Sequence, residues 1–195
     1  MRDRDTLILE DLYDGITIKE STDEDYMTLA REPEKNKKNL EKIVYSAAKH
    51  SGYTQEGCHI TDDKFSKFSI DKFGKHDFGY FGKGFYFGCG WWDKDNAKKR
   101  ALWHPSKLEG NYIMYVFIKL DNPLIEFAGQ RSLGGKLPEE YDGAIIRDPY
   151  TGSYSEIMVK DAYKIKSSDI VTYNDQNIII PISQRFDSTK EDIRY

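Results

Sequence analysis

Three short segments of the sequence each place one polar, reactive side chain among apolar residues. The polar residue is His59 in GCHIT, Tyr86 in GFYFG and Glu156 in SEIMV. Because side chains alternate between the two faces of a strand, each of the three is expected to face away from its apolar neighbours. An imidazole, a phenol ring and a carboxylate together could bind a ligand by hydrogen bonding, stacking and charge. The alternative is that all three lie on the solvated faces of ordinary strands.

A segment dense in glycine and aromatic residues, FGYFGKGFYFGCG, surrounds Tyr86. Its glycines Gly82, Gly84 and Gly88 have the spacing GxGxxxG, which differs from the dinucleotide-binding pattern GxGxxG, and no GK[ST] follows as in a phosphate-binding loop. Alternation within GFYFG instead predicts a strand that sends its two phenylalanines to one face and Tyr86 to the other.

The composition indicates one globular domain without a strongly charged partner. The chain has 195 residues, a net charge of −4 and 14 Tyr, 10 Phe and 3 Trp, so we expect an aromatic-rich core. A negative net charge provides no overall attraction for nucleic acid or anionic membranes, and no apolar run is long enough to span a bilayer. Cys58 and Cys89 are too few for a disulfide framework, so a reduced, cytoplasmic setting is expected. His76, His104 and Cys89 do not have the spacing of a zinc site, and no metal is expected.

The elements that would position these side chains follow from periodicity. Residues 1–35 are charged and interrupted by Gly15 and Pro33, which indicates an arm with at most a peripheral hairpin. Apolar residues at helical spacing predict a helix over residues 36–50 that ends before Gly52. A short helix is also predicted over residues 93–103. Short strands are predicted at residues 57–61, 64–68, 84–87, 112–120, 143–147 and 156–159. One early helix followed by a mainly antiparallel set of strands is typical of the α+β class.

Several motifs of the chain resemble those of known ADP-ribosyltransferases. FGKGFYF resembles the signature of poly(ADP-ribose) polymerase catalytic domains, and the order His59, Tyr86, Glu156 is that of the His-Tyr-Glu triad of the diphtheria-toxin-like branch. The chain is most similar to the ADP-ribosyltransferase-like domains of polyvalent proteins in phages and mobile elements. The segments that carry this resemblance are DEDYMTL, AAKHSGY, HIT, FSKF, YDGAII and IKSSDIVTYNDQNIIIPISQRFDSTKEDIRY.

The resemblance covers residues 23–195 and leaves residues 1–22 as an N-terminal arm outside it. It implies the ADP-ribosyltransferase fold, a split antiparallel β-sandwich with flanking helices that holds NAD⁺ between two small sheets. It also implies transfer of ADP-ribose from NAD⁺ to a macromolecular acceptor, expected to be a protein, with release of nicotinamide. The setting it implies is the cytoplasm of a bacterial host, without a membrane partner.

By this resemblance the catalytic residues are His59, Tyr86 and Glu156. Glu156 would hydrogen-bond the ribose next to nicotinamide and stabilise the positive charge that develops there. Tyr86 would stack on the cationic nicotinamide ring, and His59 would hydrogen-bond the adenosine-side ribose. Ile60, Thr61 and Gly84 would join His59 and Tyr86 in binding NAD⁺, the co-substrate.

The chain departs from the family pattern at points that keep alternatives open. Ile60 stands where family members usually carry glycine after the triad histidine, and the segment after Gly90 lacks the tyrosine that usually completes the nicotinamide sandwich. Tyr154 replaces the first glutamate of the ExE pair of arginine-directed enzymes. An NAD⁺ glycohydrolase and an inactive nucleotide- or protein-binding module therefore remain alternatives. A nucleic-acid acceptor also remains open, and the sequence does not indicate an oligomeric state.

Overall fold

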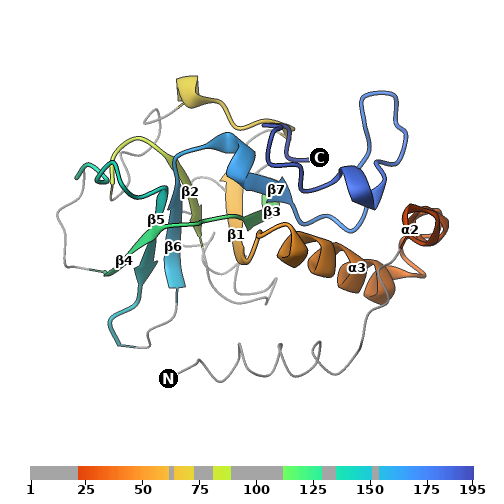
Figure 1. The fold of residues 1–195 in the computed structure, drawn as a ribbon, viewed down its shortest axis with the longest axis horizontal. Coiled ribbons are helices and arrows are strands. Elements are labelled where there is room, and N and C mark those ends of the chain that lie inside the picture. Colours follow the sequence, from red (N-terminus) through yellow and green to blue (C-terminus); the bar gives the residue numbers. More distant parts are fainter. Residues whose placement is uncertain (1–21, 62–63, 73–80, 89–111, 129–134, 151–153) are drawn as a thin grey trace.

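The computed structural model describes residues 22–61, 64–72, 81–88, 112–128, 135–150 and 154–195. Within these ranges the protein is a mixed α+β structure with a seven-stranded sheet (Figure 1). The helices are α2 (Asp23–Ala30) and α3 (Lys37–His50), with short 3₁₀ helices η1 (Ile70–Lys72), η3 (Ala162–Lys164) and η4 (Ile182–Gln184). The strands are β1 (Gln55–Thr61), β2 (Phe85–Gly88), β3 (Tyr112–Ile118), β4 (Pro123–Phe127), β5 (Gly143–Arg147), β6 (Tyr154–Val159) and β7 (Ile165–Ser167).

Both helices begin or end with local signals that the sequence contains. Helix α3 confirms the helix predicted at residues 36–50, and Gly52 follows it with φ +83°, a conformation that glycine adopts without strain. Helix α2 was not predicted, and its presence corrects the expectation of an arm over residues 1–35. Its first turn is fixed by a capping box in which Thr22 and Asp25 exchange hydrogen bonds with each other's backbone N–H groups.

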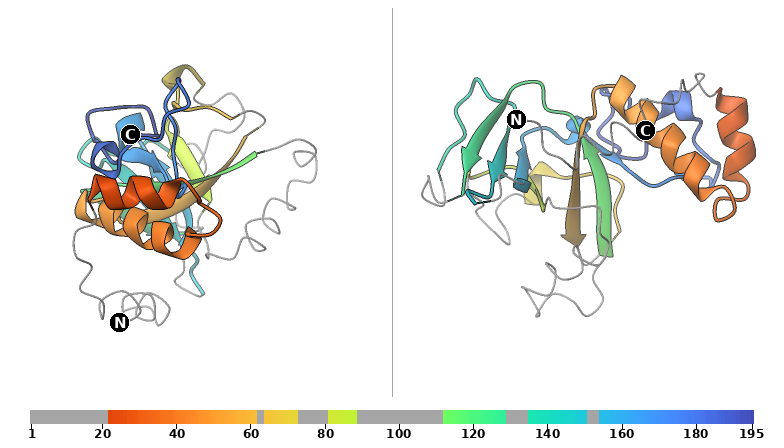
Figure 2. Two further views of the ribbon diagram at one scale, coloured as in Figure 1. Left: turned by 90° about the vertical axis from the view of Figure 1, so that its right-hand side faces the viewer. Right: turned by 90° about the horizontal axis from the view of Figure 1, so that it is seen from below.

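The sheet has the strand order β4-β5-β6-β2-β1-β3-β7, and all neighbours are antiparallel except β4 and β5. Strand β1 pairs with β3 along its whole length, from Gln55 opposite Ile118 to Thr61 opposite Tyr112. Toward β2 the registered pair among the described residues is Cys58 opposite Gly88, where the described part of β2 ends. We call the place where β1 and β2 meet, near the middle of the sheet, the β1–β2 junction. In Figure 2 the helices lie beyond β3 at one end of the molecule and β4 lies at the other.

The two faces of the sheet differ in what covers them. The face that carries Phe85 and Phe87, called the Phe face here, bears the main core, formed by Phe68, Phe85, Phe87, Val116, Ile118, Ile145, Ile157, Val159, Ala162, Ile165 and Ile193. The opposite face carries Tyr86 and Gly88 and is called the Gly88 face. One smaller core there contains Phe81, Leu137, Ala144, Ile146 and Met158, and another gathers α2, α3 and the C-terminal segment around Phe117. The aromatic-rich core that the composition indicated is present.

Five of the six predicted strands are present, and one is wrong. Residues 64–68 do not form a strand, and only Lys67 makes an isolated bridge, to Asp192. Strands β4 and β7 were not predicted. The helix predicted over residues 93–103 and the arm before residue 22 lie outside the described residues.

The segment after β7 wraps around the edge of the sheet and buries two cations. The backbone N–H of Ser167 donates to the carbonyl of Ile193 at 2.7 Å. Lys166, 1% exposed, donates to the carbonyls of Lys190 and Asp192. Arg185, 4% exposed, donates to backbone carbonyls and to the Tyr26 hydroxyl. This segment is therefore held by charge-assisted hydrogen bonds as well as by apolar contacts.

Neither described helix combines the length and apolar character needed to cross a bilayer.

Candidate active site

The three residues singled out in the sequence lie on three neighbouring strands. His59 is on β1, Tyr86 on β2 and Glu156 on β6, and these strands are adjacent in the order β6-β2-β1. Across the sheet, Gly88 lies opposite Cys58 on one side and opposite Glu156 on the other. Directly opposed residues share a face, so Cys58, Gly88 and Glu156 form one row on the Gly88 face. We call these three residues the junction row.

The middle of the junction row is open. Gly88 is exposed, and among the described residues a Cβ added to it would meet Cys58, with the Sγ atom at 3.5 Å and the carbonyl oxygen at 3.9 Å, which are ordinary contact distances. Tyr86, two residues before Gly88, points to the same face, and both Tyr86 and Glu156 are half-buried. A bare stretch of backbone therefore lies between a thiol and a carboxylate, next to an aromatic ring.

Tyr86 is fixed at both its ring and its hydroxyl. The ring packs against the small core of Phe81, Leu137, Ala144, Ile146 and Met158. Its hydroxyl accepts a hydrogen bond from the N–H of Phe81 at 3.0 Å and donates one to the carbonyl of Gly82 at 2.9 Å. The placement of Tyr86 opposite the buried Phe85 and Phe87 confirms the alternation predicted for GFYFG.

Glu156 also follows the predicted alternation. Its neighbour Ile157 is fully buried in the main core, while Glu156 is directed to the Gly88 face with one carboxylate oxygen buried. Strand β6 places it between Gly88 of β2 and Ile146 of β5. The carboxylate is therefore held at the edge of an apolar surface, where a negative charge acts more strongly than in bulk water.

His59 has the predicted orientation within β1 but an unexpected, apolar environment. Its ring lies on the Phe face, with centroids 6.1, 5.3 and 5.8 Å from those of Phe65, Phe68 and Phe87. The predicted alternation within GCHIT is confirmed, since His59 faces away from Cys58, but three phenylalanines of other segments surround its ring, which the sequence of β1 alone does not show. His59 still reaches β2, since its Nδ1 lies 3.1 Å from the carbonyl oxygen of Tyr86. A carbonyl can only accept, so Nδ1 carries a proton and donates it to this bond.

The other predicted NAD⁺-binding positions are distributed along the same strands. Thr61 is half-buried and shares the Phe face with His59. Ile60 of β1 lies opposite Ile113 of β3 in the pairing of these two strands. A Cβ added at Gly84 would lie 2.2 Å from Cε of Met158, so a neighbouring side chain already fills this space. A side chain at position 84 would therefore require the Met158 side chain to move.

Three residues of this region were not predicted from the sequence as part of a site. Cys58 and Gly88 belong to the junction row, and Glu56 lies two residues before Cys58 on the same face. Burial raises the pKa of Glu56 to about 8, against the opposing charge of Lys49. Burial, with a smaller contribution from Cys58, also raises the pKa of Tyr115, the β3 partner of Cys58. Strand alternation could have placed Glu56 and Cys58 together, but only the pairing register shows that Gly88 joins them to Glu156.

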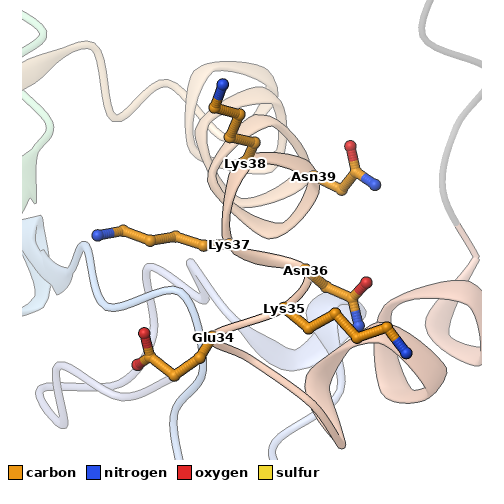
Figure 3. Close-up of a pocket in the computed structure, with 6 residues that line it drawn as sticks. All are labelled: Glu34, Lys35, Asn36, Lys37, Lys38 and Asn39. Carbon is orange, nitrogen blue, oxygen red and sulfur yellow. The ribbon is translucent and has the colours of Figure 1, made fainter.

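A separate shallow hollow lies at the turn between α2 and α3 (Figure 3). Residues 34–39 line it, and their side chains point in different directions instead of converging on one point. It contains none of the predicted site residues, and it has the character of a solvated turn.

The arrangement at the junction suits an uncharged or cationic ring and a sugar better than a metal ion. On the Gly88 face, the Tyr86 ring offers stacking and the Glu156 carboxylate offers negative charge. Among the described residues, no group of three or more histidine, cysteine, aspartate or glutamate side chains is arranged to hold a metal ion. Comparisons of the chain with protein-family models, with curated proteins and with solved structures found no match.

Proposed function

We propose that this protein is an NAD⁺-dependent ADP-ribosyltransferase, which transfers ADP-ribose from NAD⁺ to a protein acceptor and releases nicotinamide. The observation that carries the proposal is the position of His59, Tyr86 and Glu156 on the adjacent strands β1, β2 and β6. These residues come from segments far apart in the sequence, and they match a known triad in order and type. Tyr86 and Glu156 share the Gly88 face, which supports a ligand common to these two side chains, while His59 adjoins them from the Phe face.

The finer fold that we propose is the split β-sandwich of that family. The support is the β1–β2 junction, where the described residues of β1 and β2 are registered at Cys58 and Gly88, whereas β1 pairs with β3 along its whole length. In this proposal β4-β5-β6-β2 and β1-β3-β7 are the two small sheets of the sandwich. NAD⁺ would then lie over the junction row, on the Gly88 face.

Each residue would contribute one physical effect to the reaction. Cleavage of the bond between nicotinamide and ribose passes through a transition state with positive charge on the sugar, as in glycoside hydrolysis. Glu156 would stabilise that charge from a partly desolvated position, where the interaction is strongest. The Tyr86 ring would hold the cationic nicotinamide by stacking. His59 lies on the Phe face and is fixed through Nδ1 to the Tyr86 carbonyl, so in this arrangement it would hold strand β2, and with it Tyr86, in place.

The central experiment measures nicotinamide release from NAD⁺ by the wild-type protein and by Glu156→Gln. The variant keeps the size of the side chain and loses its charge, so we expect the rate to fall by about 100-fold or more with an unchanged melting temperature. Glu126→Gln is the matched control, because Glu126 lies on β4, in register with Ile146, which in turn pairs with Glu156. Its rate should equal that of the wild type. A Glu156→Gln protein that releases nicotinamide at the wild-type rate would remove Glu156 from the mechanism.

Product analysis separates transfer from hydrolysis. With a labelled NAD⁺ and a lysate of bacterial proteins, a transferase leaves the label on a macromolecule, whereas a glycohydrolase leaves free ADP-ribose. Treatment of the labelled product with protease and with nuclease then distinguishes a protein acceptor from a nucleic acid. NAD⁺ binding without any release of nicotinamide would favour a binding module instead.

A further inference from the structure

The hydroxyl of Tyr86 makes two hydrogen bonds that stacking on a ligand does not require. It joins the ring on β2 to the turn that precedes this strand, through the N–H of Phe81 and the carbonyl of Gly82. Both partners are backbone groups, so the bonds depend on the path of the chain and not on any side chain of the turn. A phenylalanine at position 86 would keep the ring and lose both bonds.

The turn itself is fixed by features other than the tyrosine. The Phe81 side chain is 1% exposed within the small core on the Gly88 face. Gly82 has φ +76°, which favours glycine, and Gly84 is packed against Met158. The turn is therefore a rigid support, and the hydroxyl attaches the ring to it.

We propose that the Tyr86 hydroxyl is a positioning group that holds the Tyr86 ring in its orientation for stacking on the nicotinamide ring. This inference rests on the function proposed above and assigns the hydroxyl a task that the stacking role leaves open. A side chain of this type has two rotatable bonds, and anchoring its tip as well as its ring removes the freedom that binding would otherwise have to restrict. The ring and the turn of residues 81–84 then act as one unit.

Two measurements on Tyr86→Phe test the proposal. The first is hydrogen exchange of the Phe81 amide, which loses its acceptor in the variant and should exchange about tenfold faster or more. The second is the dissociation constant of NAD⁺ and of free nicotinamide, which should each rise about fivefold, the effect of a net hydrogen bond lost from the support of the ring. We expect kcat at saturating NAD⁺ to change less than KM, because the ring and the Glu156 carboxylate are both retained.

Tyr141→Phe is the matched control. Tyr141 is a half-buried tyrosine that packs against the same small core, and among the described contacts its hydroxyl has no hydrogen bond. It should leave the Phe81 amide and both dissociation constants unchanged. An equal loss of affinity in Tyr141→Phe would show a general effect of the core and would overturn the proposal.

The two parts of the inference fail in distinguishable ways. Unchanged exchange of the Phe81 amide in Tyr86→Phe would show that the hydroxyl does not hold the turn. Faster exchange with unchanged affinity would show that the turn does not position the ring. If the wild-type protein binds neither NAD⁺ nor nicotinamide, the proposed function fails together with the nicotinamide role, and the exchange measurement still decides whether the hydroxyl holds the turn.

Discussion

The C-terminal segment and the strand β1 both keep charged side chains away from water, but they satisfy them differently. In the C-terminal segment, Arg185 donates to the carbonyls of Ser167 and Asp169 at 3.0 and 2.8 Å and to the Tyr26 hydroxyl at 3.3 Å. On β1, the Glu56 Oε2 atom is buried without a hydrogen-bond partner in the described part of the chain.

Arg185 is thus a buried charge that stabilises the folded state, whereas ionisation of Glu56 destabilises it. A buried cation with several acceptors contributes net hydrogen bonds and specifies one path for the chain. A buried carboxylate without donors is disfavoured when ionised, which the raised pKa of Glu56 expresses. Glu56 lies two residues from the junction row, so the strained charge is next to the candidate active site and the satisfied ones lie in the segment that closes the sheet.

Arg185→Met should have the largest effect on stability. It leaves the carbonyls of Ser167 and Asp169 and the Tyr26 hydroxyl without this donor, and we expect the free energy of unfolding to fall by about 3 kcal/mol. Urea denaturation followed by circular dichroism measures this. Arg31→Met is the control, because Arg31 is exposed. Equal free energies of unfolding for the two variants would show that the hydrogen bonds of Arg185 do not stabilise the fold.

Glu56→Gln should change stability in the opposite direction, and the change should depend on pH. The pKa of Glu56 is raised from 4.5 to about 8 in the folded state, so the folded protein binds a proton that the unfolded chain has released. The wild type therefore loses stability as the pH rises from about 4.5 to 8, and glutamine, which mimics the protonated form, does not. We expect a gain of about 2 kcal/mol in the free energy of unfolding at pH 8 and little change at pH 4.

The control for Glu56 is Glu140→Gln, since Glu140 is exposed. The difference between Glu140→Gln and the wild type should be flat over the same range of pH. If Glu56→Gln were destabilising at pH 8, Glu56 would have a donor in the folded protein, and the comparison with the C-terminal segment would fail.

Asp142→Asn should have a smaller effect that appears at neutral pH and disappears in acid. Burial acts to raise the pKa of Asp142, but hydrogen bonds from Lys164 and from the N–H groups of Asp121 and Asn122 outweigh it, and the pKa is lowered. This stability is present above the unfolded pKa of 3.8 and is lost as the pH falls through the folded pKa. We expect a loss of about 1 kcal/mol at pH 7 and a smaller one at pH 3, from urea denaturation at both values. Asp71→Asn, an exposed position, should show neither.

Lys136→Ala should have the smallest effect. Its Nζ lies 3.4 Å from Oε1 of Glu139, and the two side chains are 85% and 89% exposed. Water screens a pair of this kind, so the free energy of unfolding should change by less than about 0.5 kcal/mol in the same denaturation assay. A loss several times larger would mean that exposed pairs support this fold as the buried ones do.

The sequence predicted the elements that have a strong period. The apolar spacing of α3 and the alternation of GFYFG and SEIMV depend only on local geometry, and each placed its residues on the correct side. Helix α2 is short and begins with acidic residues, and its capping box at Thr22 and Asp25 was the available signal. Strand β7 has three residues, one of which is the buried Lys166, so no apolar run marks it.

The site was predicted in its residue types but not in its geometry. Alternation within β1 separated His59 from Cys58 correctly, but it could not show which of the two faces the phenylalanines of other segments would cover. Phe65 and Phe68 reach His59 through tertiary packing, which a single strand does not encode. The row that joins Cys58 to Glu156 depends on the pairing register, and register is a property of two strands together.

The contact between Gly84 and Met158 has a consequence for how this chain can vary. A Cβ at position 84 would lie 3.0 Å or less from three atoms of the Met158 side chain, so side chains at positions 84 and 158 would compete for the same space. Relatives of this protein that carry alanine or a larger residue at position 84 should carry a smaller residue at position 158, and relatives that keep methionine should keep the glycine. Correlated changes at positions 84 and 158 would then show that the residue before β2 and strand β6 are packed together in the relatives as well.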